Sequence, residues 1–367
     1  MSGSLVAADS VPYIMTADAV SMDDGFVVVG RTAFAPHKFA LARYRTDGSF
    51  DTSFGVGGIA QQQLGPGTGN GDEPFAIARA PDGKLVVSGW SDGPVVARFN
   101  ADGALDTGFQ QGFVRVPTFE HVGAYATGII VAGVDNMASP SEAVVARLQH
   151  DGNLDATFAT GGVIRDNVGN GSPIQLNAFA LAPDGTVLVA GISTAGSRYL
   201  RRYTAQGMPD ATFTPPTLNP TVSVSAINVL ASGRILLALT RIASDSMPGT
   251  YVGVAALTQT GALDTSFGDM GYAWSARFMD TRPSDLVVAS TGVITLTGTT
   301  EGGSRLMTAR FTPNGAPDTC FDDDGVGFGI TAESPAAVID AMDRITMVGH
   351  QYADPINTRL VVARVSP

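Results

Sequence analysis

The stretch LARYRTDGSFDTSFGVGGIA, residues 41–60, contains the pattern that decides the fold. An apolar strand ends in Ala-Arg-aromatic, an Asp-Gly turn follows, and the chain continues as Asp-x-x-Phe and a glycine-rich stretch. The Asp-x-x-Phe pair occurs six times, at intervals of 49 to 55 residues: Asp51/Phe54, Asp106/Phe109, Asp155/Phe158, Asp210/Phe213, Asp264/Phe267 and Asp318/Phe321. So regular a spacing predicts one array of a repeated supersecondary unit, and hence a single domain over residues 1–367.

A second repeated unit lies between these copies. In residues 75–89 an apolar run reaches Pro81-Asp82-Gly83 and a second apolar run follows. An Asp-Gly pair between two short apolar runs predicts a β-hairpin. The chain carries seven such hairpins and seven strands of the Ala-Arg-aromatic type, with no helical periodicity. We therefore predict an all-β fold, a seven-bladed β-propeller with four antiparallel strands per blade.

The two ends of the chain predict how the ring closes. The last repeat ends at Pro367, after its third strand and before any fourth. Residues 4–9 precede the first repeat and have no partner within it. We expect this N-terminal segment to form the outer strand of the seventh blade, which would cover an exposed sheet edge.

Composition restricts the partners. The net charge is -12 and the only lysines are Lys38 and Lys84, so the field of the protein repels nucleic acid and anionic membranes. The apolar runs have the length of strands, too short to span a bilayer, and we expect no membrane insertion. Cys320 is the only cysteine and can form no intrachain disulfide. Protein or carbohydrate ligands remain, and we expect a monomer.

The signature Asp-x-x-Phe-Gly-x-x-Gly after an Ala-Arg-aromatic strand resembles the bacterial delta-sixty repeat family, with residues 51–58 the fullest match. The hairpins are also similar to NHL-type blades. Two copies depart from the glycine pattern, at residues 214–216 and 322–324. The resemblance implies a propeller and an extracytoplasmic or secreted setting, but names no ligand. Residues 1–10 lack the pattern of a secretory signal, so either the protein is cytosolic or a signal has been removed.

The repeated aspartates are interpreted as turn residues. Each carboxylate can accept backbone N–H groups two or three positions on, while the phenylalanine packs between blades. The fifth copy has Ala256 in place of the arginine but keeps Asp264, which suggests that the aspartate does not need the arginine. No cofactor is expected. The alternative is calcium at Asp322, Asp323 and Asp324, although their spacing is not that of an EF-hand.

Candidate binding residues are found where the repeats differ. The residue after the second strand of each repeat is Arg31, Trp90, Val134, Ile192, Thr240, Thr299 or His350. His350, Arg31 and Trp90 fall on repeats seven, one and two, which are neighbours in a closed ring. Tyr352 and Glu73, with His37 and Asp72, belong to the same arc. A cation, an aromatic face and an imidazole there suit an anionic or carbohydrate ligand.

Two classes of function remain open. The first is a non-enzymatic binding module that holds a protein or glycan at the mouth or rim of the propeller. The alternative is a hydrolase or lyase acting on a polysaccharide or lactone at the central pocket, with His350, His37, Arg31 or His121 as catalytic candidates.

Two finer variants of the enzyme reading depend on geometry. His37 and His350 with Glu73 or Asp72 could hold zinc or iron, although no spacing motif supports a metal site. His121, beside Glu120, could act as a general base in a lyase or hydrolase, although adjacent residues usually point apart and need not form a dyad.

Overall fold

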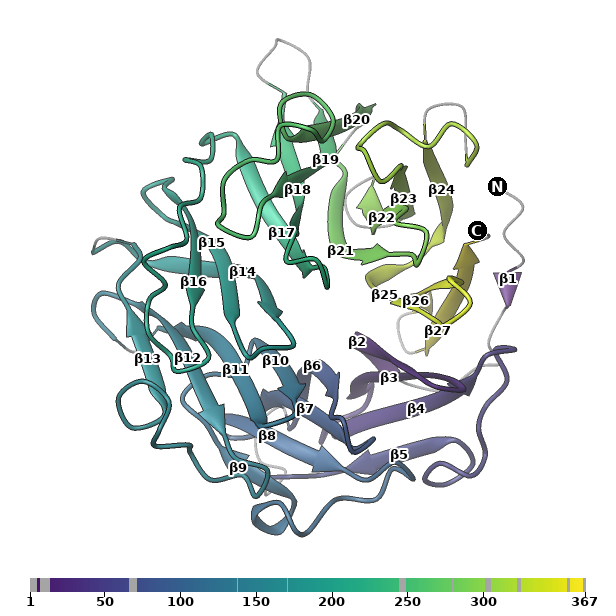
Figure 1. The fold of residues 1–367 in the computed structure, drawn as a ribbon. Helices are drawn as coiled ribbons and strands as arrows, with labels where there is room; N and C mark the ends of the chain where they lie inside the picture. The colour runs from purple at the N-terminus through teal and green to yellow at the C-terminus, as the bar shows by residue number, and fades with distance from the viewer. Residues whose placement is uncertain are drawn as a thin grey trace.

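The computed structural model describes residues 5–6, 14–65, 71–136, 138–169, 171–243, 249–278, 280–300, 305–321, 325–354 and 357–365. Seven antiparallel sheets surround a central opening, as Figure 1 shows, and each sheet is one blade. This arrangement confirms the predicted all-β, seven-bladed propeller. No helix of the described part is long and apolar enough to cross a membrane.

The blades are numbered in chain order. Blade 1 holds β2 (Ile14–Met22), β3 (Gly25–Thr32), β4 (Phe39–Arg45) and β5 (Ile59–Gln62). Blade 2 holds β6 (Glu73–Arg79), β7 (Leu85–Trp90), β8 (Pro94–Phe99) and β9 (Phe113–Arg115), with the 3₁₀ turn η1 (Gln110–Gly112) before β9. Blade 3 holds β10 (His121–Tyr125), β11 (Gly128–Asp135), β12 (Glu142–Leu148) and β13 (Val163–Asp166). Blade 4 holds β14 (Ile174–Leu181), β15 (Val187–Ser193) and β16 (Arg198–Tyr203).

The later blades repeat the plan. Blade 5 holds β17 (Val222–Val229), β18 (Ile235–Ile242), β19 (Thr250–Leu257) and β20 (Tyr272–Phe278). Blade 6 holds β21 (Arg282–Val288), β22 (Ile294–Thr300), β23 (Arg305–Phe311) and β24 (Val326–Thr331). Blade 7 holds β25 (Glu333–Ile339), β26 (Ile345–Asp354), β27 (Asn357–Val365) and β1 (Leu5–Val6).

The ring closes in the predicted way. β1 pairs antiparallel with β27, with Leu5 opposite Ala363 and Val6 opposite Val362. The first strand of blade 1, β2, also contacts β6 of blade 2 and β25 of blade 7, so the innermost strands form an unbroken circle. Blade 4 differs from the prediction, because its sheet contains three strands among the described residues. The chain at 214–216, where the glycine pattern is replaced by Thr-Pro-Pro, forms no strand, since proline cannot donate to a ladder.

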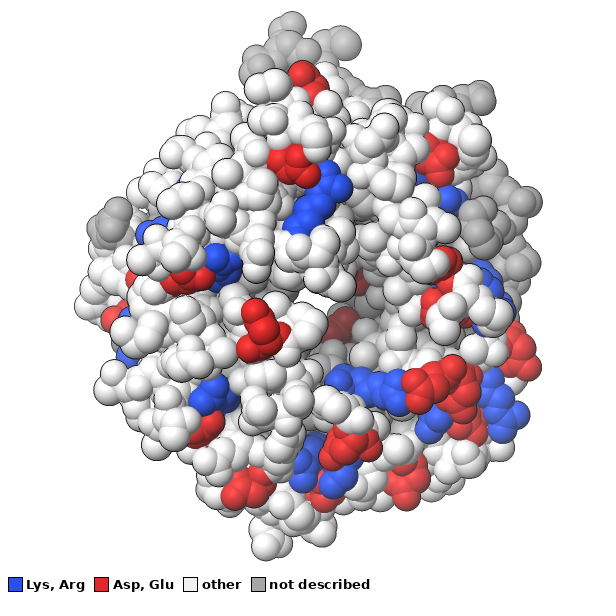
Figure 2. Space-filling view, viewed as in Figure 1, with Lys and Arg blue, Asp and Glu red and all other residues white. Residues whose placement is uncertain are grey.

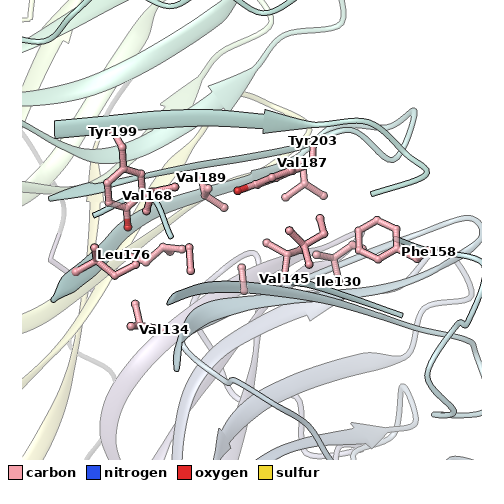
Figure 3. Close-up of a cluster of buried hydrophobic side chains, with 14 of the residues drawn as sticks. Ile130, Val134, Val145, Phe158, Val168, Leu176, Val187, Val189, Tyr199 and Tyr203 are labelled. Carbon is pink, nitrogen blue, oxygen red and sulfur yellow. The ribbon is translucent and has the colours of Figure 1, made fainter. Parts of the chain in front are cut away.

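The hydrophobic core lies between the blades. Figure 3 shows Phe158 in a cluster that joins side chains of blade 3, such as Val145, to Val187 and Tyr203 of blade 4. The other motif phenylalanines at positions 54, 109, 213 and 267 occupy corresponding clusters between their own neighbouring blades. Burial of a motif phenylalanine at these five junctions stabilises the packing of neighbouring blades.

The motif aspartates fix the corner that leads into each outer strand. Asp51 Oδ1 accepts the Ser53 backbone N–H at 3.2 Å and the Ser53 hydroxyl at 2.6 Å. Backbone N–H groups two residues on bond in the same way to Asp106, Asp155, Asp210, Asp264 and Asp318. The turn role predicted for these residues is therefore confirmed.

Candidate functional site

The innermost strands surround a cavity of about 340 Å³ in the central channel, to which all seven blades contribute. We call it the central cavity. Figure 2 shows the hollow at the middle of one face, with acidic side chains beside and within it. The cavity lies where β-bulges interrupt the pairing of first and second strands, for example between Thr16 and Asp18 and between Pro74 and Ala76. A bulge turns a side chain out of the regular alternation, and here residues such as Phe75 face the channel.

One position of the innermost strand is equivalent in all seven blades. Its residue pairs with the second-strand residue that lies two places before the position compared above, which is Arg31 in blade 1 and Trp90 in blade 2. The innermost-strand position is occupied by Asp18, Ala76, His121, Ala178, Ala226, Asp285 and Ala336. Four blades carry alanine there and three carry an ionisable side chain. Because each of these residues lines the central cavity, the exceptions determine its chemistry.

Asp18 and Asp285 join neighbouring blades from inside the channel. Asp18 accepts the backbone N–H of Ile77 in blade 2 at 2.9 Å, and Asp285 accepts that of Ala337 in blade 7 at 3.2 Å. Burial raises the pKa of Asp18 to about 7, against the lowering effect of its backbone hydrogen bonds, and it also raises the pKa of Asp285. Both carboxyls are thus held by the scaffold and favour their neutral form.

Glu120 is differently placed. Burial raises its pKa to about 7, opposed by a hydrogen bond from the Val134 backbone. Its Oε2 atom is buried and has no hydrogen-bond partner among the described residues. Glu120 lines the central cavity, but this oxygen is enclosed, since a Cβ on Gly133 would lie 3.1 Å from it.

His121 also lines the cavity, so Glu120 and His121 face the same space although they are adjacent in the chain. The His121 ring stacks on Phe179 with centroids 5.9 Å apart. Burial lowers its pKa to about 4, against a hydrogen bond to the Leu176 backbone, so the imidazole is neutral at pH 7.

The predicted rim residues gather only in part. Arg31 Nε lies 3.7 Å from Glu73 Oε1, and Glu73 is directly opposite Trp90 in the pairing of β6 with β7. His350 is 4% exposed and its Nδ1 lies 2.9 Å from the Thr16 hydroxyl, so it belongs to the interior and not to an open rim. Burial lowers the pKa of His350, while Glu333 raises it and Arg31 lowers it further.

Two other residues of the arc have structural contacts. Asp72, predicted to belong to the arc of binding residues, is 2% exposed and accepts the Leu64 backbone N–H at 2.5 Å. His37 Nδ1 donates to the Thr32 carbonyl at 2.6 Å. Both fix the loop that joins blade 1 to blade 2, because the Asp72 N–H also donates to the His37 carbonyl. The backbone of Tyr352 lies in β26, and its side chain is outside the described part.

Within the described ranges no group of three His, Cys, Asp or Glu side chains is arranged to hold a metal ion. The combination of His37 and His350 with Glu73 or Asp72 is therefore not assembled there. The calcium alternative concerns residues 322–324, which lie outside the described residues.

An aromatic strip leads from the central cavity to the surface. Phe75 lines the cavity, and the centroid of its ring lies 5.0 Å from that of Phe119. The Phe119 ring in turn contacts Trp90 edge-on, with ring centroids 5.6 Å apart. Phe75 and Trp90 are 41% and 44% exposed, values that are high for such large apolar rings. Comparing equivalent positions of the seven repeats identified Trp90 but did not identify Phe75, Asp18 or Asp285. Alignment of the first strands on the second-strand glycines would have found all three.

Comparison with known proteins agrees with this fold. The sequence matches the family model described as "Domain of unknown function (DUF5122) beta-propeller" over residues 23–54, 80–109, 128–158 and 182–213. Each match runs from a hairpin to an Asp-x-x-Phe phenylalanine. A search of curated proteins gives no match.

Solved structures give the same result at the level of the fold. The WD40 domain of coronin from Toxoplasma gondii aligns with a TM-score of 0.54 at 11% identity, over 100% of this chain and 87% of that one. Drosophila Semaphorin 2a aligns with a TM-score of 0.57 at 8% identity, over 96% and 74%. Identities this low show the fold alone. The seven blades and the family match together make the chain a β-propeller repeat protein.

Proposed function

We propose that the protein is a binding module that holds a glycan, with one sugar unit in the central cavity and its neighbours along the aromatic strip. The observation that carries this proposal is the continuity of Phe75, Phe119 and Trp90 from the cavity wall to the exposed face. Aromatic rings offer flat apolar faces to the C–H faces of sugars, and polar groups beside them receive the hydroxyls.

The cavity lining supports a neutral ligand. Its polar groups include the Glu120 carboxyl, Asn177, Ser225 and Ser284, and none of the described residues that line it is an arginine or a lysine. Asp18 and Asp285 are engaged with backbone N–H groups, so they define the wall more than they contact a ligand. An anionic ligand would meet carboxyl groups without a compensating cation, which is unfavourable in a buried site.

The test is a glycan-binding screen followed by calorimetric titration of the best neutral oligosaccharide. Trp90→Ala and Glu120→Gln should each raise Kd by about fivefold, since one ring contact or one buried hydrogen bond contributes about 1 kcal/mol. Met342→Ala changes another exposed apolar side chain, in the hairpin of blade 7, and should leave Kd unchanged. Equal affinities in all four proteins would contradict the proposal.

A second candidate, a hydrolase or lyase acting on a polysaccharide or lactone, is favoured by one observation. Glu120 lines the central cavity beside His121 and has a pKa raised to about 7 by burial, a value suited to a general base. Turnover of the bound glycan, lost in Glu120→Gln with binding retained, would support this candidate. Unchanged ligand after prolonged incubation with the wild-type protein would support the binding module.

We also propose that the chain is a delta-sixty repeat protein that acts outside the cytoplasm. The support is the signature in residues 51–58 and its counterparts in the other repeats. Fractionation of cells that express the full-length protein tests the location, and its recovery only in the cytoplasm would contradict it.

A further inference from the structure

A second pocket, of about 250 Å³, lies on blade 5 and shares no lining residue with the central cavity. Its wall combines the segment 217–219 before β17, Arg241 near the end of β18, and Tyr272 and Trp274 from β20. We call it the blade 5 pocket. Arg241, Tyr272 and Trp274 belong to one sheet, which holds these three wall residues in place.

Two aromatic rings fix the Arg241 guanidinium. Its central carbon lies 4.6 Å from the ring centroid of Tyr251 and 4.4 Å from that of Trp274. Tyr251 is directly opposite Arg241 in the pairing of β18 with β19. Stacking covers the flat faces of a guanidinium and leaves its N–H groups at the edge available for hydrogen bonds.

These N–H groups have no acceptor in the described structure. Several other arginines have acidic partners, as in Arg234 with Asp264 at 2.8 Å and Arg202 with Asp210 at 2.8 Å. For Arg241, no carboxylate or carbonyl of the described residues accepts a hydrogen bond. In a protein with a net charge of -12, an arginine that is half-buried in a pocket and has no acidic partner among the described residues is well suited to receive an anion.

The other pocket walls indicate which anion. The rings of Tyr272 and Trp274 are nearly parallel, at 9° with centroids 6.3 Å apart, and they present flat apolar surfaces. Asn219 keeps its oxygen occupied by the Thr221 N–H and hydroxyl, both at 2.9 Å, so it shapes the wall of the pocket. Gly253 makes room for Trp274, because a Cβ there would lie 2.5 Å from the indole.

We propose that the blade 5 pocket binds a sugar acid, with the carboxylate on the Arg241 fork and the sugar ring against Tyr272 and Trp274. A carboxylate matches the paired donors of a guanidinium, and the C–H face of a pyranose matches an aromatic ring. This site is independent of the central cavity and does not rest on the function proposed for it. It gives the protein two recognition sites of opposite preference, one for neutral and one for acidic sugar units.

The tryptophan content allows a direct test. Trp90 and Trp274 are the only tryptophans, so in Trp90→Phe the intrinsic fluorescence comes from Trp274 alone. Titration of this variant with glucuronate should give a saturable fluorescence change, and glucose should give none. Adding Arg241→Gln should raise Kd at least tenfold, and Arg241→Lys, which keeps the charge without the fork, should raise it by a smaller factor.

Arg201→Gln is the matched control, since Arg201 is an exposed arginine on blade 4 outside the pocket, and it should not change Kd. Far-ultraviolet circular dichroism checks the fold, and Arg241→Lys decides the question if Arg241→Gln fails to fold. Three results would overturn the proposal: no saturable change with glucuronate, equal binding of acetate and glucuronate, or binding of an acidic peptide but not of glucuronate.

Discussion

Arg234 Nη2 lies 2.8 Å from Asp264 Oδ2, and the Arg234 guanidinium lies over the Phe267 ring at 5.0 Å. In blades 2, 3, 4 and 6 the same ion pair and ring contact come from the arginine of the third strand, as in Arg202 with Asp210 and Phe213. Blade 5 has Ala256 at that position, and the arginine comes instead from the hairpin between β17 and β18. The expectation that Asp264 does without an arginine is therefore wrong.

The first prediction concerns this substituted ion pair. Arg234→Ala should lower the free energy of unfolding by about 1 kcal/mol, because the two side chains are 25% and 23% exposed and solvent screens part of their attraction. Ala256→Arg in the same protein restores the arginine of the other blades and should recover most of the loss. Urea denaturation of the three proteins measures both effects. A double variant no more stable than Arg234→Ala would show that the two arginine positions are not equivalent.

The second prediction concerns Phe267, the motif phenylalanine that packs between blades 5 and 6. Phe267 has no exposed surface, and Phe267→Ala should destabilise the protein by about 3 to 5 kcal/mol through lost burial and a cavity. Phe34→Ala removes a ring that is 54% exposed and should change stability by less than about 0.5 kcal/mol. Thermal and urea unfolding measure the difference. Similar losses for the two variants would mean that the junction relaxes around the missing ring.

The third prediction concerns pH and Asp18. Burial, opposed by hydrogen bonds from Ile77 and Ala19 and reinforced by Asp285, raises its pKa to about 7 in the folded protein. The raised pKa of Asp18 adds to the free energy of unfolding. This contribution is fully present below the pKa of Asp18 in the unfolded chain, about 4, and is lost as the pH rises to about 7. Stability should fall across this window by at most about 1.4 kcal/mol per pH unit.

Asp18→Asn should remove this part of the pH dependence, since the amide stays neutral. The readout is the difference in unfolding free energy between wild type and variant from pH 4 to pH 8. Asp82→Asn, at an exposed hairpin, is the control and should follow the wild type. Parallel curves for wild type and Asp18→Asn would contradict an Asp18 that stays protonated to neutral pH.

The fold followed from the sequence because its signals are local and repeated. Asp51 and Ser53 form a turn within three residues, and the same pattern recurs in five other copies. The closure by β1 was also predictable, because a strand without a partner at one end matched a blade without an outer strand at the other.

The candidate site could be predicted from the sequence only in part, because it depends on contacts between residues of different blades that are far apart in the chain. Trp90 and Arg31 could be found by comparing equivalent positions. The burial of His350 against Thr16 could not, since these residues are 334 positions apart in the chain. The central cavity depends on bulges that the apolar pattern of β2 or β21 does not mark, so Asp18 and Asp285 appeared as ordinary strand residues.

The last prediction joins packing to the blade 5 pocket. Gly253 is buried opposite Trp274, and a Cβ there would lie 2.4 Å from the Ala273 carbonyl oxygen and 2.5 Å from the indole. Gly253→Ala should therefore cost about 1 to 3 kcal/mol through overpacking and should shift the Trp274 emission in a Trp90→Phe background. Gly329→Ala, in β24, adds a Cβ at an ordinary 3.5 Å contact and should do neither. An unchanged emission spectrum in Gly253→Ala would mean that Trp274 is not held against Gly253, and the ring would then be too loosely placed to fix Arg241.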